Sequence, residues 1–481
     1  MRFQIERHLL PLLHKAPKDK HLLAATAISE IITPPEFNPY DYVSFLVHID
    51  AEIEHALMVQ YLYSAYSLGG AQVPEEHQAT VSKWQEIILG IAKEEMAHLI
   101  SAQNVLRLIG APLNLSREDY PWDSPFYPFP FKLEPLTFNS LAKYIYCESP
   151  EDWSGPEAEE IKRRVHAQDK TPHRVGTLFT LLIGLLENPD YLPDEAFQAD
   201  TFPFQASWDE WGRGYKGGAR GNAKAGSPEG TPNLLVVPLA TRDDAVSALK
   251  LIAQQGEACA DDSQELSHFQ RFLDIYREMK TLGVYDEEAP DSGGWKAARP
   301  AAVNPYVPPK PENEQDDNYS EERDPITNKE AQLWAHLFNV RYRLMLQYLQ
   351  HSFELAAGLN SVGNFTPRGL IINSTFGEMY NMRAISNFLV QTPLSQTCLE
   401  ADKVAGPPFL MPYTLSLPLG EINRWRQHKD LLQASETLIR QLLAISQSQR
   451  HGYLNALKEA DQSLLASIDS IMRDSAVRAR I

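Results

Sequence analysis

The sequence predicts an all-α protein in which a four-helix bundle occupies residues 1–289 and a second helical array occupies residues 328–481. Apolar residues recur at helical spacing through long segments of both halves, as expected for helices that bury one face. A proline-rich, charged stretch at 290–327 separates the halves and has the composition of a linker. With 481 residues, 43% of them hydrophobic, the chain can build a sizeable core in each half.

Charge and composition exclude several classes of function. The chain has 44 basic and 63 acidic residues, and its net charge of −19 repels nucleic acids and anionic membrane surfaces. No apolar run reaches membrane-spanning length and the opening residues do not resemble a signal peptide, so we expect a cytoplasmic protein that binds neither nucleic acid nor membrane. The three cysteines lie far apart without a Cys-x-x-Cys motif, which indicates idle thiols in a reducing compartment.

The first long helix is expected over residues 40–68, where a Gly-Gly pair ends it. Glu54 falls within the apolar stripe of this helix and is therefore a candidate metal ligand; a partly exposed acid is the alternative. Glu52 and His55 lie to either side of the stripe, where we expect them to be solvated or to support a ligand from outside.

The second helix, over residues 79–109, carries Glu95 and His98 in the same face as its apolar residues. Because the two side chains are three residues apart on a helix they project together, and burying both is costly unless a cation compensates them. A chance pair on a surface helix would have the same spacing, so the pair indicates a metal site only if other helices supply matching ligands. The short loop between the first two helices predicts antiparallel neighbours.

The third helix is expected over residues 175–186, an almost continuous apolar run. It offers no inward carboxylate, and Thr177 is one of its inward polar residues. Before it, residues 121–135 are rich in proline and in aromatic side chains such as Trp122 and Phe126. We expect this segment to cover the core, with the lining of a substrate pocket as the alternative.

The fourth helix is expected over residues 245–282, after a long insertion at 189–232. It contains a second Glu-x-x-His pair, Glu265 with His268. Glu257 lies on the same face if the helix is continuous, but eleven residues then span roughly 16 Å, too far for Glu257 and His268 to share one metal centre. Either Glu265 and His268 are the ligand pair, or a bulge in between brings Glu257 back.

The C-terminal half is expected to form helices at about 328–359, 371–389, 421–447 and 454–473. The pairs there that most resemble metal ligands are His351 with Glu354 and Glu378 with Asn381. Neither pair has the Glu-x-x-His order, so the N-terminal half is the expected place for metal.

Several segments, taken in order, are similar to the motifs of one protein family. They are 52–56 (Glu-Ile-Glu-His-Ala) with 61–63, 93–98 (Lys-Glu-Glu-Met-Ala-His), 173–176 (His-Arg-Val-Gly), 255–257 (Gln-Gly-Glu), 267–272 and 405–409. The chain thereby resembles the ferritin-like iminophenyl-pyruvate dimer synthase family. Members of that family couple two imines made from oxidised aromatic amino acids, in bacterial pathways such as those of violacein and rebeccamycin. The match is most specific in the first 280 residues.

Carried over residue by residue, the resemblance implies a set of metal ligands: Glu54, Glu95, His98, Glu257 and His268. Glu265 is added on spacing alone. The chain departs from the family pattern at Thr177, in a segment where relatives commonly have a glutamate. A site for two metals would therefore lack one expected carboxylate.

The leading hypothesis is a non-haem iron-dependent oxidoreductase of bacterial natural-product biosynthesis, with one or two iron ions or manganese and a small amino-acid-derived substrate. The first alternative is coupling of two aromatic imines, in which Tyr61, Trp122, Phe126 and Thr177 would line the substrate pocket. The second alternative is a metal-free ferritin-like scaffold or binding protein. The sequence leaves open the substrate, the number of metals and the oligomeric state, a homodimer included.

Overall fold

The computed structural model describes residues 36–119, 126–169, 172–212, 216–217, 231–257, 266–308, 323–356, 366–396, 403–412 and 415–473. Trp122 and Glu265 lie outside these ranges, and of Glu257 only the backbone is described. The chain divides into two compact units. The N-terminal unit is Met1–Lys132 with Leu136–Ala298, and the C-terminal unit is Leu133–Pro135 with Arg299–Ile481.

Two long helices, α3 (Pro39–Ser67) and α4 (Gln78–Leu108), pack along one another and confirm the first predicted pair. The Asn38 side chain caps the start of α3 by accepting a hydrogen bond from the Asp41 amide. Gly69 and Gly70 follow its end at φ values of 89° and 113°, which other residues rarely adopt. A short 3₁₀ turn, Glu75–His77, leads into α4, so the two helices lie antiparallel.

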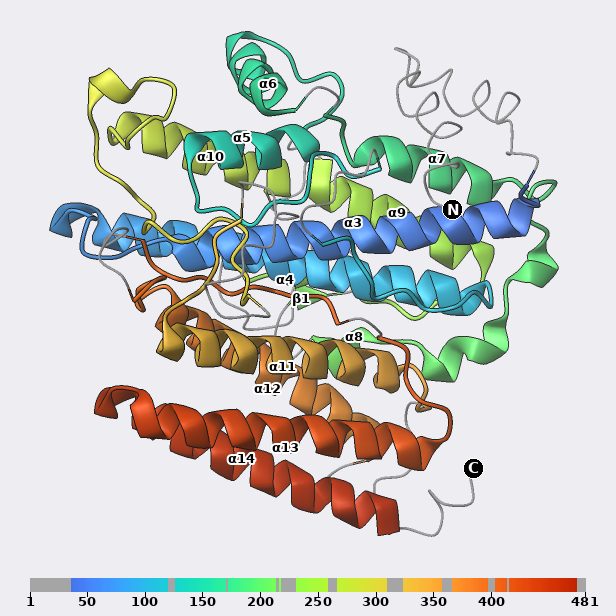
Figure 1. The fold of residues 1–481 in the computed structure, drawn as a ribbon. Helices are drawn as coiled ribbons and strands as arrows, with labels where there is room; N and C mark the ends of the chain where they lie inside the picture. The colour runs from blue at the N-terminus through green and yellow to red at the C-terminus, as the bar shows by residue number, and fades with distance from the viewer. Residues whose placement is uncertain are drawn as a thin grey trace. The chain divides into compact units, whose positions relative to one another are not determined.

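The third helix of the bundle is built from two pieces. The first piece is α5 (Phe138–Cys147), which packs against α10, and the second is α7 (Gly176–Glu187), which packs against α3 and α9 (Figure 1). The intervening chain includes α6 (Pro156–Gln168) and then returns, because the Val175 amide donates to the Cys147 carbonyl at 3.1 Å. The sequence identified only the second piece as the bundle helix.

The fourth helix is also interrupted, so of the two arrangements considered for residues 245–282 the continuous helix is wrong and an interruption between Glu257 and His268 is found. The chain forms α9 (Arg242–Glu257) and α10 (His268–Thr281). Ser267 has extended backbone angles, and its side chain caps α10 by accepting from the Gln270 amide at 3.2 Å. The helical spacing that paired Glu265 with His268 therefore does not apply, because the helix begins at His268.

Short elements complete the N-terminal unit. The 189–232 insertion contains α8 (Trp208–Trp211) and the 3₁₀ turns Asp194–Ala196 and Ala199–Phe204. Strands β1 (Lys216–Gly217) and β2 (Asn233–Leu234) form a two-stranded parallel pair, and a last 3₁₀ turn covers Pro290–Ser292. Among the described residues, none of the helices is long and apolar enough to cross a membrane.

The C-terminal unit is a second array of antiparallel helices. It comprises α11 (Lys329–Ser352), α12 (Pro367–Leu389), α13 (Glu421–Ile445) and α14 (Ser448–Arg473). Its apolar core contains Leu344, Tyr348, Leu355, Ile371, Trp425, Leu432 and Ile468. The predicted helices of this half are confirmed, with ends shifted by a few residues.

The polar pairs noted in the C-terminal half bond to protein groups. His351 lies between Glu421, 3.1 Å from its Nε2, and His428, 2.9 Å from its Nδ1. Glu354 pairs with Arg424 at 3.1 Å. Within the described part of this unit, these residues do not form a group whose ligand atoms could surround a metal ion.

A fully buried arginine ties the four C-terminal helices together. Arg341 of α11 donates to Glu378 of α12 at 3.1 Å, to Ser435 of α13 at 2.5 Å and to Asp461 of α14 at 2.8 Å. Its side chain is 0% exposed. Each helix thus contributes one member of the network, and the guanidinium is the cation that makes burial of both carboxylates tolerable.

We predict that Arg341→Met destabilises the C-terminal unit by about 3–5 kcal/mol, because two buried carboxylates lose their cation. Hydrogen exchange followed by mass spectrometry reports α11–α14 separately and would show faster exchange of their amides. Arg440→Met, at an exposed position of α13, is the matched control and should change stability by less than about 0.5 kcal/mol. Equal protection in both variants would contradict this role of Arg341.

Candidate metal centre

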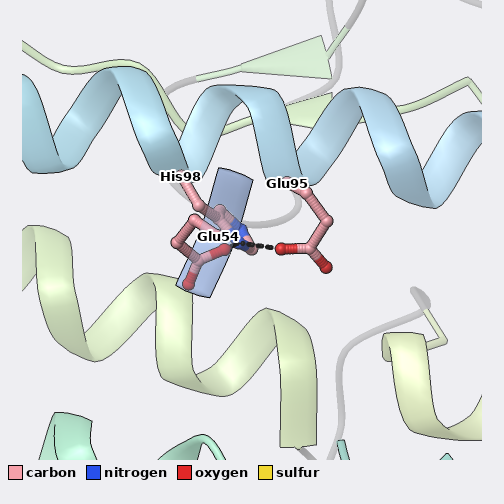
Figure 2. A group of neighbouring side chains, drawn as sticks. All are labelled: Glu54, Glu95 and His98. Carbon is pink, nitrogen blue, oxygen red and sulfur yellow. Dashed lines mark hydrogen bonds and ion pairs between the residues drawn. The ribbon is translucent and has the colours of Figure 1, made fainter. Parts of the chain in front are cut away.

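Three buried side chains from α3 and α4 converge at the middle of the N-terminal bundle. Nδ1 of His98 lies 3.3 Å from Oε2 of Glu54 and 3.2 Å from Oε2 of Glu95. All three side chains are at most 3% exposed. Figure 2 shows the two carboxylates and the imidazole directed toward one another. Their ligand atoms are close enough to bind a single ion.

A second group of three adjoins the first and shares Glu95 with it. Nδ1 of His268 lies 2.7 Å from Oε1 of Glu95 and 3.8 Å from Oε2 of Glu148. These three side chains are also buried, and their ligand atoms could again surround one ion. The rings of His98 and His268 stack with their centroids 5.5 Å apart. The structure therefore contains two neighbouring groups of possible ligands with one carboxylate in common.

The proton of His98 is placed by Gln255. The amide nitrogen of Gln255 donates to the Asn233 carbonyl at 2.9 Å, so its oxygen must face Nε2 of His98, which lies 2.8 Å away. An amide oxygen can only accept, so Nε2 of His98 carries the proton. In the neutral ring Nδ1 then carries the lone pair, which points at the carboxylates of Glu54 and Glu95.

A parallel arrangement holds His268. Its Nε2 lies 3.1 Å from Glu94, which also accepts from the Arg271 guanidinium and from the Asn233 amide at 2.8 Å. Burial alone would raise the pKa of Glu94, but Arg271 and the hydrogen bond from His268 lower it to about 2. Glu94 is therefore an anion that accepts a proton from Nε2, so Nδ1 of His268 faces Glu95 and Glu148.

Buried atoms without hydrogen-bond partners mark this centre as a place for positive charge. Glu95 Oε1 and His268 Nδ1 are buried and close, yet neither makes a hydrogen bond. A lone pair on Nδ1 that faces carboxylate oxygens is repelled by them unless a proton or a metal ion lies between. Carboxylate and imidazole donors that converge in this way fit a divalent metal ion.

The electrostatics of the centre agree with its geometry. Burial alone would lower the pKa of His268, but the charge of Glu95 and the neighbouring carboxylates of Glu148 and Glu94 raise it to about 10. Burial raises the pKa of Glu95, and the charges of Glu54 and Glu148 raise it further, against the lowering effect of His268. Both shifts show that the surroundings stabilise any added positive charge.

Glu148 supplies the carboxylate that the third helix lacked in the sequence. It follows α5 directly, at the point where the third bundle helix is interrupted. The Tyr61 hydroxyl donates to its Oε1 at 2.7 Å, which leaves Oε2 on the side of His268. Gly256 permits the close approach of α9, because a Cβ atom there would lie 2.9 Å from Oε2 of Glu148.

The other candidate residues have different surroundings. Thr177 is a half-buried residue of α7 and is absent from both ligand groups. Phe126 is buried against Phe45 of α3, with ring centroids 5.9 Å apart. Tyr61 lies at the centre itself, as the hydrogen-bond donor to Glu148. Glu257 ends α9 directly after the Gln255-Gly256 pair, and the structure describes only its backbone.

Glu52 and His55 lie outside the two ligand groups and bond to the segment that follows α4. Glu52 accepts from Asn114 at 3.1 Å, and Nδ1 of His55 lies 3.0 Å from the Leu115 carbonyl. Both side chains are buried. They therefore fix the segment that follows α4 against α3, and the prediction that they could be solvated is wrong.

Sequence reasoning missed Glu148, Glu94 and Gln255 as members of the centre. Glu148 was not identified because the segment before it, Phe138–Cys147, was not predicted to form half of a bundle helix. Its only sequence signal is its place at the end of an apolar helix, Phe138–Cys147. Glu94 and Gln255 belong to motifs that the sequence did single out, and only the fold shows that they orient the two imidazoles.

Comparisons with known proteins support the bundle. Residues 47–277 match the family model described as ferritin-like. The chain is 25% identical over 402 residues to dichlorochromopyrrolate synthase of Lentzea aerocolonigenes, an alignment that covers 77% of this chain and 36% of that protein. The chain thus spans about a third of the length of this curated relative.

Among solved structures, a ferritin-like protein from Caulobacter vibrioides is similar at 17% sequence identity, covering 76% of this chain and 98% of that one with a TM-score of 0.39. The predicted fold class is confirmed by the family match together with the helices described above. The helices of residues 47–277 thus have the ferritin-like fold of the family model that they match.

Proposed function

We propose that this chain is a metal-dependent oxidoreductase of natural-product biosynthesis whose N-terminal bundle holds two iron or manganese ions. The observation that carries the proposal is the convergence of two imidazole Nδ1 atoms on three buried carboxylates in two groups that share Glu95. Ferritin-like carboxylate proteins use this combination of ligands, with Glu and His side chains projecting into the bundle. The natural-product context rests on the 25% identity to dichlorochromopyrrolate synthase.

The charges of the ligands favour two divalent ions over one. Glu54, Glu95 and Glu148 supply three carboxylates. Asp50, one helical turn before Glu54, is a fourth that is fully buried. Burial and the Glu54 charge raise the pKa of Asp50, and its Oδ1 has no hydrogen-bond partner. Four carboxylates would balance two divalent cations.

The donor atoms favour iron or manganese. Oxygen and imidazole nitrogen suit these metals, whereas thiolates favour zinc, copper and iron–sulfur clusters. The buried thiol of Cys147 lies 3.6 Å from the Tyr61 hydroxyl, but burial raises its pKa, so it stays a thiol rather than a thiolate ligand. When bound, iron would supply redox chemistry and Lewis acidity to an organic substrate.

The protein's own part is to hold the ligands in place. Tyr61 orients Glu148, Gln255 fixes the tautomer of His98, and Glu94 fixes that of His268. Such outer partners keep the lone pairs directed at the metal and raise the basicity of the ligands. These side chains are buried, and the low dielectric of the protein interior strengthens each of their electrostatic interactions.

A second candidate function is the coupling of two aromatic imines, with the metal in a structural role. The similarity to dichlorochromopyrrolate synthase and the motif resemblance to imine-coupling enzymes favour it. Orientation of two substrates would then account for most of the rate. Activity that survives complete removal of metal by chelation would support this candidate against the first.

We predict that the purified protein holds about two iron or manganese ions per chain and that Glu95→Ala loses most of both, because Glu95 belongs to both ligand groups. Elemental analysis of the metal content tests this. Glu157→Ala, which removes an acid of α6 that pairs with Arg277 outside the centre, should keep the wild-type content. A wild-type protein without stoichiometric metal, or a Glu95→Ala variant that keeps it, would refute the proposal.

Gln255→Leu removes the oxygen that accepts from His98 while keeping a buried side chain of similar size. We expect metal affinity to fall about 10–100-fold, because the imidazole loses the partner that fixes its tautomer. Competition with a chelator of known affinity measures the change. Gln254→Leu, at the exposed neighbouring position, should leave affinity unchanged. Equal affinity in the two variants would show that Gln255 does not position a ligand.

Metal binding should release protons. Since the pKa of His268 is raised to about 10, its imidazole is protonated near pH 7.5 and must lose about one proton to bind metal. Metal affinity should therefore fall as the pH is lowered from 10. In metal-free protein the raised pKa stabilises the fold below pH ~6.5 and this contribution is lost as the pH rises through about 10.

Titration calorimetry with Mn²⁺ in two buffers of different ionisation enthalpy measures the number of protons released. The expected result is a binding enthalpy that changes with the buffer. Identical enthalpies in both buffers would mean that His268 is neutral before metal binds, contrary to the charge distribution described here.

A further inference from the structure

In the described part of this strongly acidic chain, Arg174 is held by a hydroxyl and an aromatic ring rather than by a carboxylate. The chain has 63 acidic residues, and other arginines of the N-terminal unit pair with carboxylates. These are Arg117, Arg163, Arg164, Arg242, Arg271 and Arg277. Among the described residues, no carboxylate lies within ion-pair distance of Arg174, although it is partly buried.

The guanidinium of Arg174 is nevertheless held in one orientation. Its Nε donates to the Ser149 hydroxyl at 2.9 Å, and that hydroxyl donates to the Tyr146 carbonyl at 2.8 Å. The guanidinium carbon lies over the Tyr146 ring, 5.0 Å from its centroid. These contacts engage Nε and one face of the group. The two Nη atoms, which form the fork that binds carboxylates, are not used by them.

The backbone around Arg174 is fixed beside the metal centre. The amide of Val175 donates to the Cys147 carbonyl at 3.1 Å, and the amide of His173 donates to the Pro128 carbonyl at 3.0 Å. Cys147 and Ser149 are the two chain neighbours of Glu148, which belongs to the ligand group of His268. The residues that hold Arg174 are therefore adjacent in the chain to a candidate ligand.

We propose that Arg174 binds the carboxylate of an organic acid substrate and holds that substrate beside the metal centre. The inference rests on the proposed function and deepens it, since it assigns a residue that positions the substrate. A fixed guanidinium with free Nη atoms binds a carboxylate through two parallel hydrogen bonds, at little cost in side-chain entropy. Tyr146, beneath the guanidinium, adds to the rigidity of the site.

The test compares two stable probes that differ in charge, 3-phenylpropionate and its uncharged amide, 3-phenylpropionamide. Titration calorimetry measures their binding to the full chain, as purified and after chelation. We expect the carboxylate to bind at least about 10-fold more tightly than the amide, in keeping with a charge-assisted bidentate contact. Arg174→Gln should abolish this preference without changing amide binding, and Arg174→Lys should restore part of it.

Arg163→Gln is the matched control, because Arg163 is an exposed arginine of α6 that already pairs with Glu288. It should keep the full preference for the carboxylate. Metal content, measured on the same samples, separates the two proposals. A wild type that holds no metal as purified refutes the metal function, whereas the response of the carboxylate preference to Arg174→Gln tests the role of Arg174. A carboxylate preference that survives Arg174→Gln but disappears on chelation would assign the anion to the metal and overturn the proposal. A wild type without any preference would overturn it as well.

Discussion

Mutual repulsion among buried carboxylates is the constraint on which the N-terminal unit depends. Glu54, Glu95 and Glu148 lie close together in the interior, and two imidazole nitrogens face them. Without positive charge between them, each carboxylate would raise the free energy of the others and the bundle would be destabilised. The raised pKa values of His268 and Glu95 mean that added positive charge, such as a proton, is stabilised at this centre. Gln255 and Glu94 lie outside the two ligand groups and orient the imidazoles that would bind this cation.

The two interrupted helices explain how the ligands reach one point. In a straight helix the ligands must lie about one turn apart on one face. Here Glu148 follows the end of α5, and His268 is the first residue of α10. The interruptions thus let helix ends, rather than helix interiors, supply ligands. The same detour after Glu148 returns the chain at Val175 and fixes Arg174 next to the centre.

The sequence predicted the continuous helices and the candidate ligands on them, but it did not predict the interrupted helices. Glu54, Glu95 and His98 could be identified because a helical period places them in the apolar face of α3 and α4. Glu148 could not, because its role depends on α5 and α7 together forming one bundle helix, which is a tertiary fact. The helical spacing that paired Glu265 with His268 does not apply for a similar reason: periodicity assumes an unbroken helix, whereas Ser267 caps the start of a new one, and Glu265 itself lies outside the described residues.

The most direct measurement is a crystal structure of the purified protein with anomalous scattering collected on both sides of the iron and manganese absorption edges. Two anomalous peaks are expected, one between Glu54, Glu95 and His98 and one between Glu95, Glu148 and His268, with both histidines bound through Nδ1. The absence of peaks at this centre, or ligation through Nε2, would contradict the account.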